Sequence, residues 1–297
     1  MELRPDLSSD QLILNGEIAA PEKTARVSHF LYHIRQKAGI SERAEIVSEN
    51  NFSTGAGLAS SASAFASLAQ AGSRAAGLNL SATQLSELAR LGSWSAARSI
   101  FGGFVEMNWG EKPDGFDSIA VQLADEHFWD LRLFIAVISE EEKKTGSTEE
   151  MTLTAQTSPF YHTWIERQPE DLTEMRLAII NRNFEKLGEL AEYNCLKMHA
   201  TMLSSRPGLI YWNSTTVTVM HAIRQLRQKG TAVYFTIDAG PQVKAICQPE
   251  DVSIVQETLE QIDVGMQVME TGLGSGVELI EVKKWPSLAA RLENSFC

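Results

Sequence analysis

The alternation of hydrophobic and polar residues predicts both helices and strands along the chain. In the stretch 24–38, Val27, Leu31 and Ile34 recur at helical spacing and share one face. The stretch 131–139 (LRLFIAVIS) is instead a nearly continuous apolar run, which is typical of a central strand. A buried helix face and a buried strand in one chain indicate that helices pack against sheets.

Similar patterns predict elements on both sides of this apolar strand. Further strands are expected at 11–14, 44–49, 104–109, 232–237, 243–247 and 277–282. Further helices are expected at 58–76, 81–91, 158–167, 171–183, 184–204, 214–229 and 249–261. This mixed order, without a detectable internal repeat, favours the α+β class with a layered architecture. We place the domain boundary near Phe128, which gives domains 1–128 and 129–297.

Composition and charge narrow the class of protein. With 43% hydrophobic and 22% charged residues, the chain of 297 residues has the composition of a globular protein. Its formal net charge of −12 argues against general binding to nucleic acid or anionic membrane, because the field repels polyanions. No apolar run approaches the roughly 20 residues that span a bilayer, and Cys195, Cys247 and Cys297 show no C-x-x-C spacing. We therefore expect a soluble protein with free thiols in the reducing cytoplasm.

A small-residue segment at 55–63 (GAGLASSAS) is the candidate binding site for an anion. Its glycines let the backbone turn sharply and approach a ligand without a Cβ atom in the way. The helix expected after it presents unpaired N–H groups and the positive end of its dipole. The segment matches neither a P-loop nor a dinucleotide fingerprint. Two interpretations follow: a phosphate-binding loop, or an Ala/Ser-rich helix with a glycine-containing first turn.

Five segments, in order along the chain, resemble motifs of the mevalonate diphosphate decarboxylases, a family of the GHMP kinase superfamily. The first is 50–63 (NNFSTGAGLASSAS), in which Ser53 stands where the family usually has proline. The others are 93–104 (SWSAARSIFGGF), 143–151 (KKTGSTEEM) with 157–161 and Trp164, 236–241 (TIDAGP), and 272–276 (GLGSG). The resemblance extends from about Leu12 to Glu281.

The resemblance implies a role for residues in each segment. It implies that Arg98 binds the substrate carboxylate, that Ser93 and Ser95 contact the substrate, and that Ser147 belongs to a substrate loop. Asp238 would be the general base that takes the proton of a tertiary 3-hydroxyl group. ATP and its phosphates would be bound by the residues of the first segment, with Ser60 or Ser61 as a candidate Mg²⁺ ligand; these are Gly55, Gly57, Leu58, Ala59, Ser60, Ser61 and Ser63.

The residues alone leave alternatives open for the charged side chains. Arg98 offers a planar fork for a carboxylate or phosphate, but it equally fits a surface or interdomain salt bridge. Asp238 precedes a Gly-Pro turn, which aspartate favours without any catalytic role. Lys143 and Lys144 either add positive charge near phosphate or form part of a solvated charge run.

The resemblance also implies a fold and a reaction. The expected architecture is α+β, with an N-terminal half like ribosomal protein S5 domain 2 and a GHMP kinase C-terminal-like half. The implied reaction is ATP-dependent decarboxylation of mevalonate 5-diphosphate to isopentenyl diphosphate, through phosphorylation of the 3-hydroxyl, with ATP and Mg²⁺ as cofactors. The implied assembly is a homodimer without nucleic-acid or membrane partners.

Several alternatives to this reaction remain at the level of sequence. The first alternative is a decarboxylase of mevalonate monophosphate, and the second is a 3-kinase that phosphorylates without decarboxylation. The third is a non-catalytic protein that binds a nucleotide or diphosphate. A structural, partner-binding domain would bind none of these ligands. Met1–Ile13 does not match the lysine-bearing segment with which the family begins. We therefore expect the chain to be poorly active or inactive without that segment.

Overall fold

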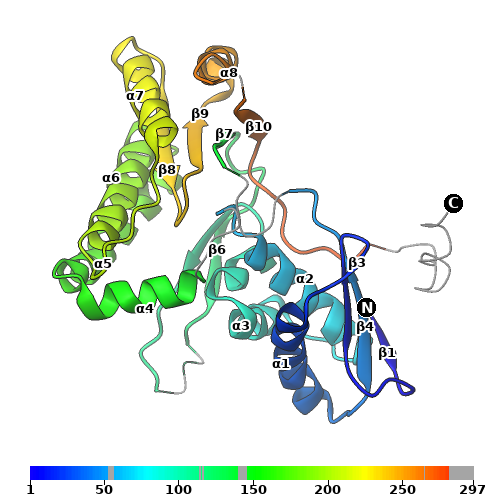
Figure 1. Cartoon of the computed structure of the whole chain (residues 1–297). Helices are drawn as coiled ribbons and strands as arrows, with labels where there is room; N and C mark the ends of the chain where they lie inside the picture. Colours follow the sequence, from blue (N-terminus) through cyan, green and yellow to red (C-terminus); the bar gives the residue numbers. More distant parts are fainter. Residues whose placement is uncertain (53–56, 114, 116, 140–145, 264, 281–297) are drawn as a thin grey trace, which may run out of the picture.

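The structure is a computed structural model that describes residues 1–52, 57–113, 115, 117–139, 146–263 and 265–280. Its first half contains a four-stranded sheet in the order β1-β4-β2-β3, in which β2 and β4 are parallel and the other pairs antiparallel. These strands are β1 (Glu2–Arg4), β2 (Gln11–Leu14), β3 (Glu17–Ile18) and β4 (Arg43–Ser48). The segments predicted at 11–14 and 44–49 are therefore strands of one sheet (Figure 1).

Helices pack against this sheet through one apolar core. They are α1 (Pro21–Ala38), α2 (Ser60–Ala75) and α3 (Ala82–Gly92). The apolar face predicted for 24–38 is buried, since Leu31 and Ile34 join a cluster that also contains Leu12 and Phe65. The 3₁₀ helix η1 (Trp94–Ile100) follows α3, and β5 (Phe104–Met107) then pairs with β6 (Ala120–Ala124).

The second half is built on an antiparallel sheet in the order β10-β7-β9-β8. Its strands are β7 (Arg132–Val137), β8 (Val233–Ile237), β9 (Val243–Cys247) and β10 (Gln267–Thr271). The apolar run at 131–139 thus supplies a strand with neighbours on both sides, as its pattern predicted. The hairpin expected from 232–237 and 243–247 is confirmed, with Ile237 opposite Val243.

Helices of the second half bury both faces of that sheet. Val233 and Phe235 pack in a core with residues of α7 and α8, whereas the intervening Tyr234 packs with residues of α5 and α6. The helices are α4 (Ser147–Thr157), α5 (Tyr161–Ile180), α6 (Phe184–Leu203), α7 (Ser214–Gln228) and α8 (Val252–Glu260), with the short 3₁₀ helix η2 (Pro249–Asp251) before α8. None of the described helices combines the length and apolar character needed to cross a bilayer.

Helix α5 corrects the prediction of separate helices at 158–167 and 171–183. It runs unbroken through Pro169, which lacks the N–H that would bond to the carbonyl of Ile165. Both residues are exposed, so solvent can hydrate that carbonyl. Pro169 therefore does not end α5, because it lies on the solvent-exposed face of the helix.

The end of the second half also differs from the prediction. Residues 277–280, the described part of the predicted strand at 277–282, are not in a strand. The edge strand is β10, whose mostly exposed and half-buried residues give no apolar run. After β10 the chain returns to the first half, where Gly103 N donates to Gly274 O (3.0 Å) and Val277 N donates to Ile100 O (3.2 Å). Figure 1 shows this return as the orange segment that runs from β10 toward the lower half. The division at residues 128 and 129 stays a prediction.

Candidate functional site

The glycine loop before α2 touches the turn after β8. Gly57 has a φ of +80°, and a Cβ atom on it would lie 3.2 Å from Gly240 Cα and 3.6 Å from Ala239 O. Glycine is therefore favoured at position 57 both by its backbone conformation and by the close approach, since a Cβ atom there would push the neighbouring backbone aside. The contact brings the predicted phosphate loop to the predicted Asp238 turn, although the two come from different halves of the chain. Gly55 lies outside the described residues.

The first turn of α2 has the form of an anion site. Ala59, with a φ of +55°, precedes the helix, and no side chain caps it within the described part of the chain. Leu58 and Ala59 lead the backbone into Ser60 and Ser61, so N–H groups and hydroxyls occur together at the start of a 16-residue helix. Ser63, one turn later, donates its hydroxyl to Ser60 O at 3.1 Å. The predicted phosphate-binding residues that are described thus line one helix start.

A chain of hydroxyl groups links this helix start to η1. Ser61 Oγ lies 3.4 Å from Ser93 Oγ, and Ser93 Oγ lies 3.2 Å from Ser95 Oγ. Ser93 is both the C-cap of α3 and the N-cap of η1, so its position is fixed by both helices. The serine predicted to bind phosphate and the serines predicted to contact substrate are neighbours in space.

Arg98 lines a cavity, whereas Ser93 and Ser95 are not among the lining residues of that cavity. The cavity has a volume of about 460 Å³ and is also lined by Ser63, Ser67, Ser275 and Gly276. The guanidinium is exposed and forms no ion pair or hydrogen bond with any described residue, so the salt bridge considered from the sequence is not found there. A free planar cation beside serine hydroxyls suits a carboxylate or a phosphate.

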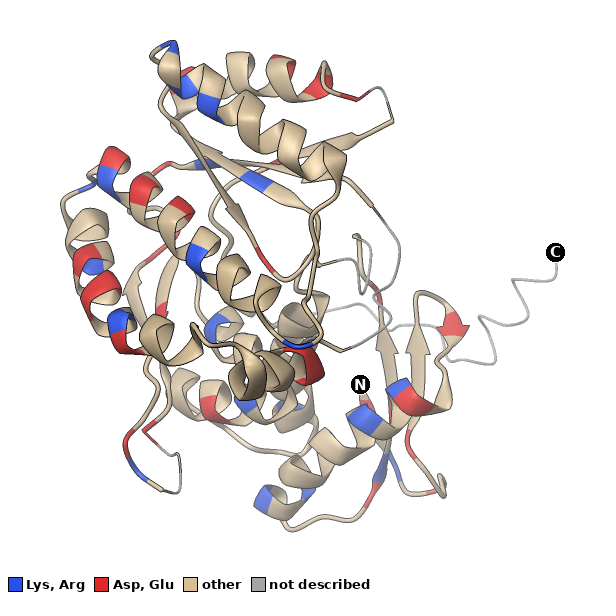
Figure 2. Cartoon of the chain, turned by 60° about the vertical axis from the view of Figure 1, so that its left-hand side comes forward, with Lys and Arg blue, Asp and Glu red and all other residues tan. Residues whose placement is uncertain are grey.

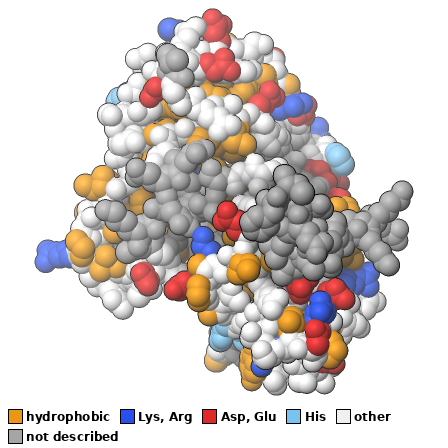
Figure 3. All heavy atoms as spheres, turned by 45° about the vertical axis from the view of Figure 1, so that its right-hand side comes forward, with side chains coloured by type: hydrophobic (Ala, Val, Ile, Leu, Met, Phe, Trp, Pro, Cys, Tyr) orange, Lys and Arg blue, Asp and Glu red, His pale blue; other side chains and the backbone are white. Residues whose placement is uncertain are grey.

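On the face drawn in Figure 3, the positive charge of the described residues is mixed with negative charge. Figure 3 shows acidic, basic and hydrophobic side chains scattered over the visible face, with no continuous basic patch among the residues that are described. The attraction for an anion is therefore local to the cavity and the helix start rather than a property of the whole face.

Asp238 stands at the carboxyl end of β8, where the strand turns through Gly240 and Pro241. Its side chain is 65% exposed, and Lys244 Nζ donates a hydrogen bond to its Oδ2 at 2.7 Å. Lys244 comes from β9 and is only 11% exposed. The sequence analysis missed Lys244; the available signal was a lysine within the apolar strand VKAIC, on the hairpin that carries Asp238.

Two α6 side chains hold the residue before Asp238. Ile237 N donates to Cys195 Sγ at 3.1 Å, Cys195 Sγ donates to Ile237 O at 3.4 Å, and His199 Nε2 lies 3.3 Å from the same carbonyl. Burial raises the pKa of the Cys195 thiol to about 11 and lowers the pKa of His199 to about 4. Both groups are therefore neutral near pH 7 and act as hydrogen-bonding supports. These residues were also missed by the sequence analysis, because no local pattern links α6 to β8.

Ser147 begins α4, which the sequence analysis treated as a loop. Within this helix Glu150 is buried and accepts a hydrogen bond from the Tyr211 hydroxyl. Burial raises the pKa of Tyr211, so the phenol keeps its proton and remains a donor. Tyr211 packs edge-on against His199 at 6.1 Å between ring centroids, which connects α4 to the support of the Asp238 turn. Lys143 and Lys144 lie outside the described residues.

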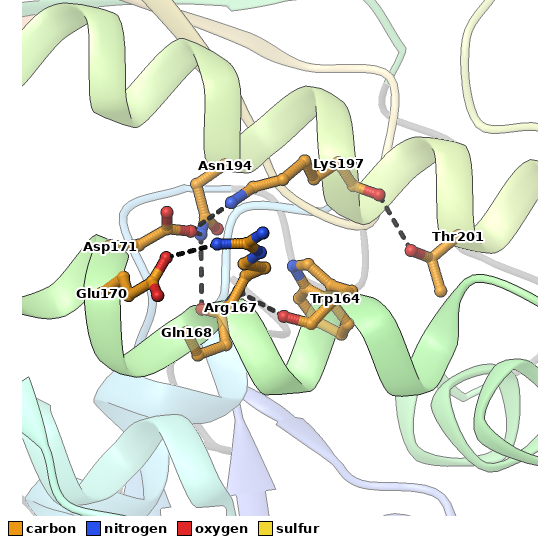
Figure 4. Close-up of polar contacts among 8 residues, drawn as sticks. All are labelled: Trp164, Arg167, Gln168, Glu170, Asp171, Asn194, Lys197 and Thr201. Carbon is orange, nitrogen blue, oxygen red and sulfur yellow. Dashed lines mark hydrogen bonds and ion pairs between the residues drawn. The ribbon is translucent and has the colours of Figure 1, made fainter.

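A second polar cluster lies between α5 and α6, and it is saturated by its own charges (Figure 4). Lys197 pairs with Asp171, which also accepts from Asn194 Nδ2 at 3.1 Å. Arg167 pairs with Glu170 at 2.7 Å. The ribbon in Figure 2 carries basic and acidic residues along this pair of helices. The cluster stabilises the helix pair and offers no unpaired charge to a ligand among its labelled residues.

Metal binding at the site rests on oxygen atoms. Within the described ranges there is no group of three or more His, Cys, Asp and Glu side chains that would hold a metal ion. Mg²⁺ accepts few protein ligands when phosphates and water complete its octahedron. The hydroxyls of Ser60 and Ser61 at the start of α2 fit a Mg²⁺ ion that arrives with nucleotide phosphates.

Comparison with protein families gives two matches that cover most of the chain. Residues 1–120 match the diphosphomevalonate decarboxylase-like N-terminal domain. Residues 133–285 match the mevalonate 5-diphosphate decarboxylase C-terminal domain. The motifs noted in the sequence lie within these matched ranges.

Individual proteins give the same picture. The chain is 39% identical over 245 residues to a diphosphomevalonate decarboxylase of Candida albicans, which is 78% of this chain and 67% of that protein. It is 36% identical over 253 residues to the Homo sapiens diphosphomevalonate decarboxylase, covering 80% of this chain and 62% of that protein. The chain thus spans roughly two-thirds of the length of these curated relatives.

Solved structures resemble the fold over nearly the whole chain. A mevalonate diphosphate decarboxylase from Staphylococcus aureus aligns with a TM-score of 0.88 and 40% identity, covering 94% of this chain and 84% of that one. A complex of MDDEF with MVAPP, AMPPCP and magnesium aligns with a TM-score of 0.87 and 38% identity, covering 94% and 85% of the two chains. The α+β architecture expected from the sequence is confirmed by these neighbours.

Proposed function

Because the chain belongs to the mevalonate diphosphate decarboxylase family, we propose that it converts mevalonate 5-diphosphate and ATP to isopentenyl diphosphate, CO₂, ADP and phosphate. One observation of the molecule carries the proposal. The glycine loop before α2 contacts the Asp238 turn. A nucleotide phosphate bound on the loop would therefore lie close to the substrate hydroxyl that a base on the turn deprotonates. The related complex with MVAPP, AMPPCP and magnesium supports ATP and Mg²⁺ as cofactors.

The start of α2 binds the phosphates of ATP in this proposal. The N–H groups that follow Gly57, Leu58 and Ala59 donate to phosphate oxygens, and the helix dipole favours the negative charge. Serine hydroxyls at 60 and 61 add donors, and Ser63 adds one once it releases Ser60 O. Ser60 or Ser61 is the candidate ligand of Mg²⁺. The metal neutralises charge on the phosphates while the loop fixes their position.

Asp238 acts as the general base. It takes the proton from the 3-hydroxyl of the substrate, and the oxygen attacks the γ-phosphorus of ATP. Its large exposure at the end of β8 gives a hydroxyl access to the carboxylate, and the hydrogen bond from Lys244 fixes the direction in which the carboxylate faces. The alternative, in which Asp238 only favours the turn, does not explain a lysine brought through an apolar strand to meet it.

Arg98 binds the carboxylate that leaves as CO₂. The guanidinium has no partner among the described residues, and Ser93 and Ser95, which come just before Arg98 in the chain, add hydroxyl groups for the substrate. Ser147, at the first residue of α4, is placed by this proposal in the segment that closes on the substrate. A bidentate guanidinium holds the carboxylate in a fixed plane while the adjoining carbon loses its phosphate.

The second phase of the reaction needs no further catalyst group. The carbon–oxygen bond to the new phosphate breaks, and the phosphate leaves with that electron pair. The bond to the carboxylate carbon then breaks, CO₂ departs, and its electron pair forms the alkene. The residues only hold charge and position in this phase, which is how phosphoryl-transfer sites generally act.

The site allows two further reactions on the same framework. A 3-kinase releases ADP without CO₂, and a decarboxylase of mevalonate monophosphate prefers the shorter substrate. Arg98, which has no ion pair with a described residue, favours decarboxylation over phosphorylation alone, since a kinase has no need to hold the carboxylate rigidly. Measuring both products with both substrates separates these reactions.

We also propose a division into domains 1–128 and 129–297, and a homodimer in the cytoplasm. Two apolar cores formed largely by residues on either side of residue 128 support the division, although Phe104, Leu123 and Phe128 pack on the core of the second half and Val277 packs on that of the first. The buried free thiols of Cys195 and Cys247 suit a reducing compartment. Light scattering of the purified protein tests the dimer, and a monomeric mass at micromolar concentration would contradict it.

The test of the reaction follows ADP and CO₂ release together, with mevalonate 5-diphosphate and Mg-ATP. We expect equal amounts of both products, and a fall of about 10²- to 10⁴-fold in kcat for Asp238→Ala, the range for loss of a general base. Asp171→Ala is the matched control, because it removes an ion-paired aspartate between α5 and α6. Absence of both products from the wild type, with nucleotide still bound, would make the chain a binding protein rather than an enzyme.

A further inference from the structure

Lys244 is a buried cation in an otherwise apolar strand. Every residue of β9 is buried, and Lys244 lies opposite Thr236 in β8, one step from the end of the hairpin. Its Nζ is 2.7 Å from Asp238 Oδ2, although the lysine side chain is only 11% exposed. The long side chain therefore extends along the sheet face to the turn that carries Asp238.

Stability alone does not explain a lysine at this position. Removing an ammonium group from water is costly, whereas its partner Asp238 is 65% exposed, and an ion pair with an exposed carboxylate contributes little. A methionine or leucine would fill the same part of β9 without that cost. The presence of Lys244 is therefore better explained by its contact with the Asp238 carboxylate than by a contribution to the stability of the fold.

We propose that Lys244 is a positioning residue, which holds the Asp238 carboxylate turned toward the substrate hydroxyl. This inference rests on the proposed reaction, in which Asp238 is the base. Lys244 occupies Oδ2, so Oδ1 is the oxygen that remains to accept the proton. A general base must lie within hydrogen-bonding reach of the proton it takes. The rate of the phosphorylation step should therefore depend on the orientation of this carboxylate.

The main chain of the turn is held separately. Cys195 and His199, from α6, hydrogen-bond to the backbone of Ile237, directly before Asp238. The backbone is thereby fixed, and the torsions of the Asp238 side chain are what Lys244 restrains. Among the described residues, Lys244 is the one side chain that is hydrogen-bonded to this carboxylate.

The test compares Lys244→Met with Lys244→Arg under the assay for ADP and CO₂. We expect Lys244→Met to lower kcat by about 10- to 100-fold, the size of one hydrogen bond to a charged group. KM for both substrates should change by less than about twofold, because the carboxylate is needed for proton transfer and not for ground-state binding. Lys244→Arg should recover most of kcat, since it returns a cation to the carboxylate.

Lys197→Met is the matched control variant. Lys197 also pairs with an aspartate, Asp171, and both side chains are 18% exposed, but the pair lies between α5 and α6 (Figure 4). We expect Lys197→Met to change the thermal midpoint without changing kcat. If it lowered kcat as much as Lys244→Met, the effect of Lys244 would be a general loss of stability and the inference would be wrong.

A double-mutant cycle separates positioning from direct contact with phosphate. If Lys244 acts through Asp238, adding Lys244→Met to Asp238→Ala costs less than about twofold in kcat, because its partner is already gone. If the two losses multiply, or if KM for ATP rises about tenfold with Lys244→Met, Lys244 binds the phosphate itself. Either of those results would overturn the inference.

An NMR measurement makes the ion pair visible without turnover. We expect a ¹⁵N ammonium signal, absent from Lys244→Met, that is protected from exchange in the wild type and shifts or broadens in Asp238→Ala. A signal unaffected by Asp238→Ala would overturn the inference even in an active protein. Conversely, a wild type that shows the pair but releases no ADP would refute the proposed reaction, and with it the role of Lys244 in that reaction.

Discussion

Gly57 and Gly240 approach so closely that a Cβ atom on Gly57 would lie 3.2 Å from the Cα of Gly240. The two glycines belong to different halves of the chain, one before α2 and one after β8. Nothing larger than hydrogen fits between their backbones without displacing one of them. Their contact sets the separation between the loop proposed to hold the nucleotide and the turn that carries Asp238.

Gly57→Ala should reduce activity more than it reduces stability. The added Cβ strains a residue with a φ of +80° and pushes against the Asp238 turn. We expect kcat to fall by about tenfold or more, because small displacements of reacting groups are costly in catalysis. Steady-state kinetics, with circular dichroism to confirm folding, measures this effect.

Gly39→Ala is the control for the strain alone. Gly39 caps α1 with a φ of +68°, and an added Cβ there meets nothing within 4 Å. It should lower the thermal midpoint without altering kcat. If Gly39→Ala and Gly57→Ala lowered kcat equally, the contact with Gly240 would not be the cause.

Arg98→Lys tests whether the reaction needs the planar, bidentate guanidinium group of Arg98. Lysine keeps the charge but loses the bidentate hydrogen bonds that fix a carboxylate in one plane. We expect release of CO₂ to fall by about 10- to 100-fold, the effect of hydrogen bonds to a charged group. Binding of an ATP analogue, followed by calorimetry, should stay unchanged. Arg74→Lys, an exposed arginine on α2, is the control, and equal behaviour of the two variants would contradict the role of Arg98.

Local features of the molecule were predictable because their causes lie within a few residues. Ser81 and Gln84 form a reciprocal capping box at the start of α3, so the helix start was visible in the sequence. The hairpin of β8 and β9 follows from two apolar runs on either side of a Gly-Pro turn. The predicted roles of the site residues came from resemblance and stay predictions.

Tertiary relationships were not predictable from the pattern. The approach of Ser61 to Ser93 depends on how α2 and α3 pack, which no spacing in the sequence reveals. Helix α5 continues through Pro169 because that face of the helix is exposed to solvent, and its exposure depends on how the neighbouring elements pack. Lys244 was missed because its strand reads as apolar, and its importance comes only from the position of its ammonium group.

His199 should make the stability of the second half depend on pH. Burial lowers its pKa from 6.5 to about 4, so the unfolded chain binds a proton between these pH values and the folded protein does not. The free energy of unfolding therefore falls as the pH drops from 6.5 toward 4. For this residue the loss amounts to about 3 kcal/mol at most, and it is complete below pH 4.

The contribution of His199 is isolated by His199→Gln, which keeps a donor for Ile237 O but does not titrate. We expect urea unfolding to show a flatter dependence on pH between 4 and 6.5 for this variant than for the wild type. His221→Gln, at an exposed position on α7, should leave the wild-type dependence unchanged. Equal slopes for the wild type and His199→Gln would show that His199 does not supply the effect.

The buried ion pair of Asp10 and Arg35 should be essential to the first half. Its side chains are 1% and 8% exposed, and Asp10 Oδ1 also accepts from Ala44 N at 2.9 Å, so the carboxylate ties α1 to β4. Asp10→Ala leaves a cation buried without its partner, which should lower the free energy of unfolding by about 3–5 kcal/mol. Asp6→Ala breaks an exposed pair with Arg4 instead and should leave that free energy unchanged within error. Urea unfolding of both variants measures the difference, and equal midpoints would mean that Arg35 reaches water once Asp10 is removed.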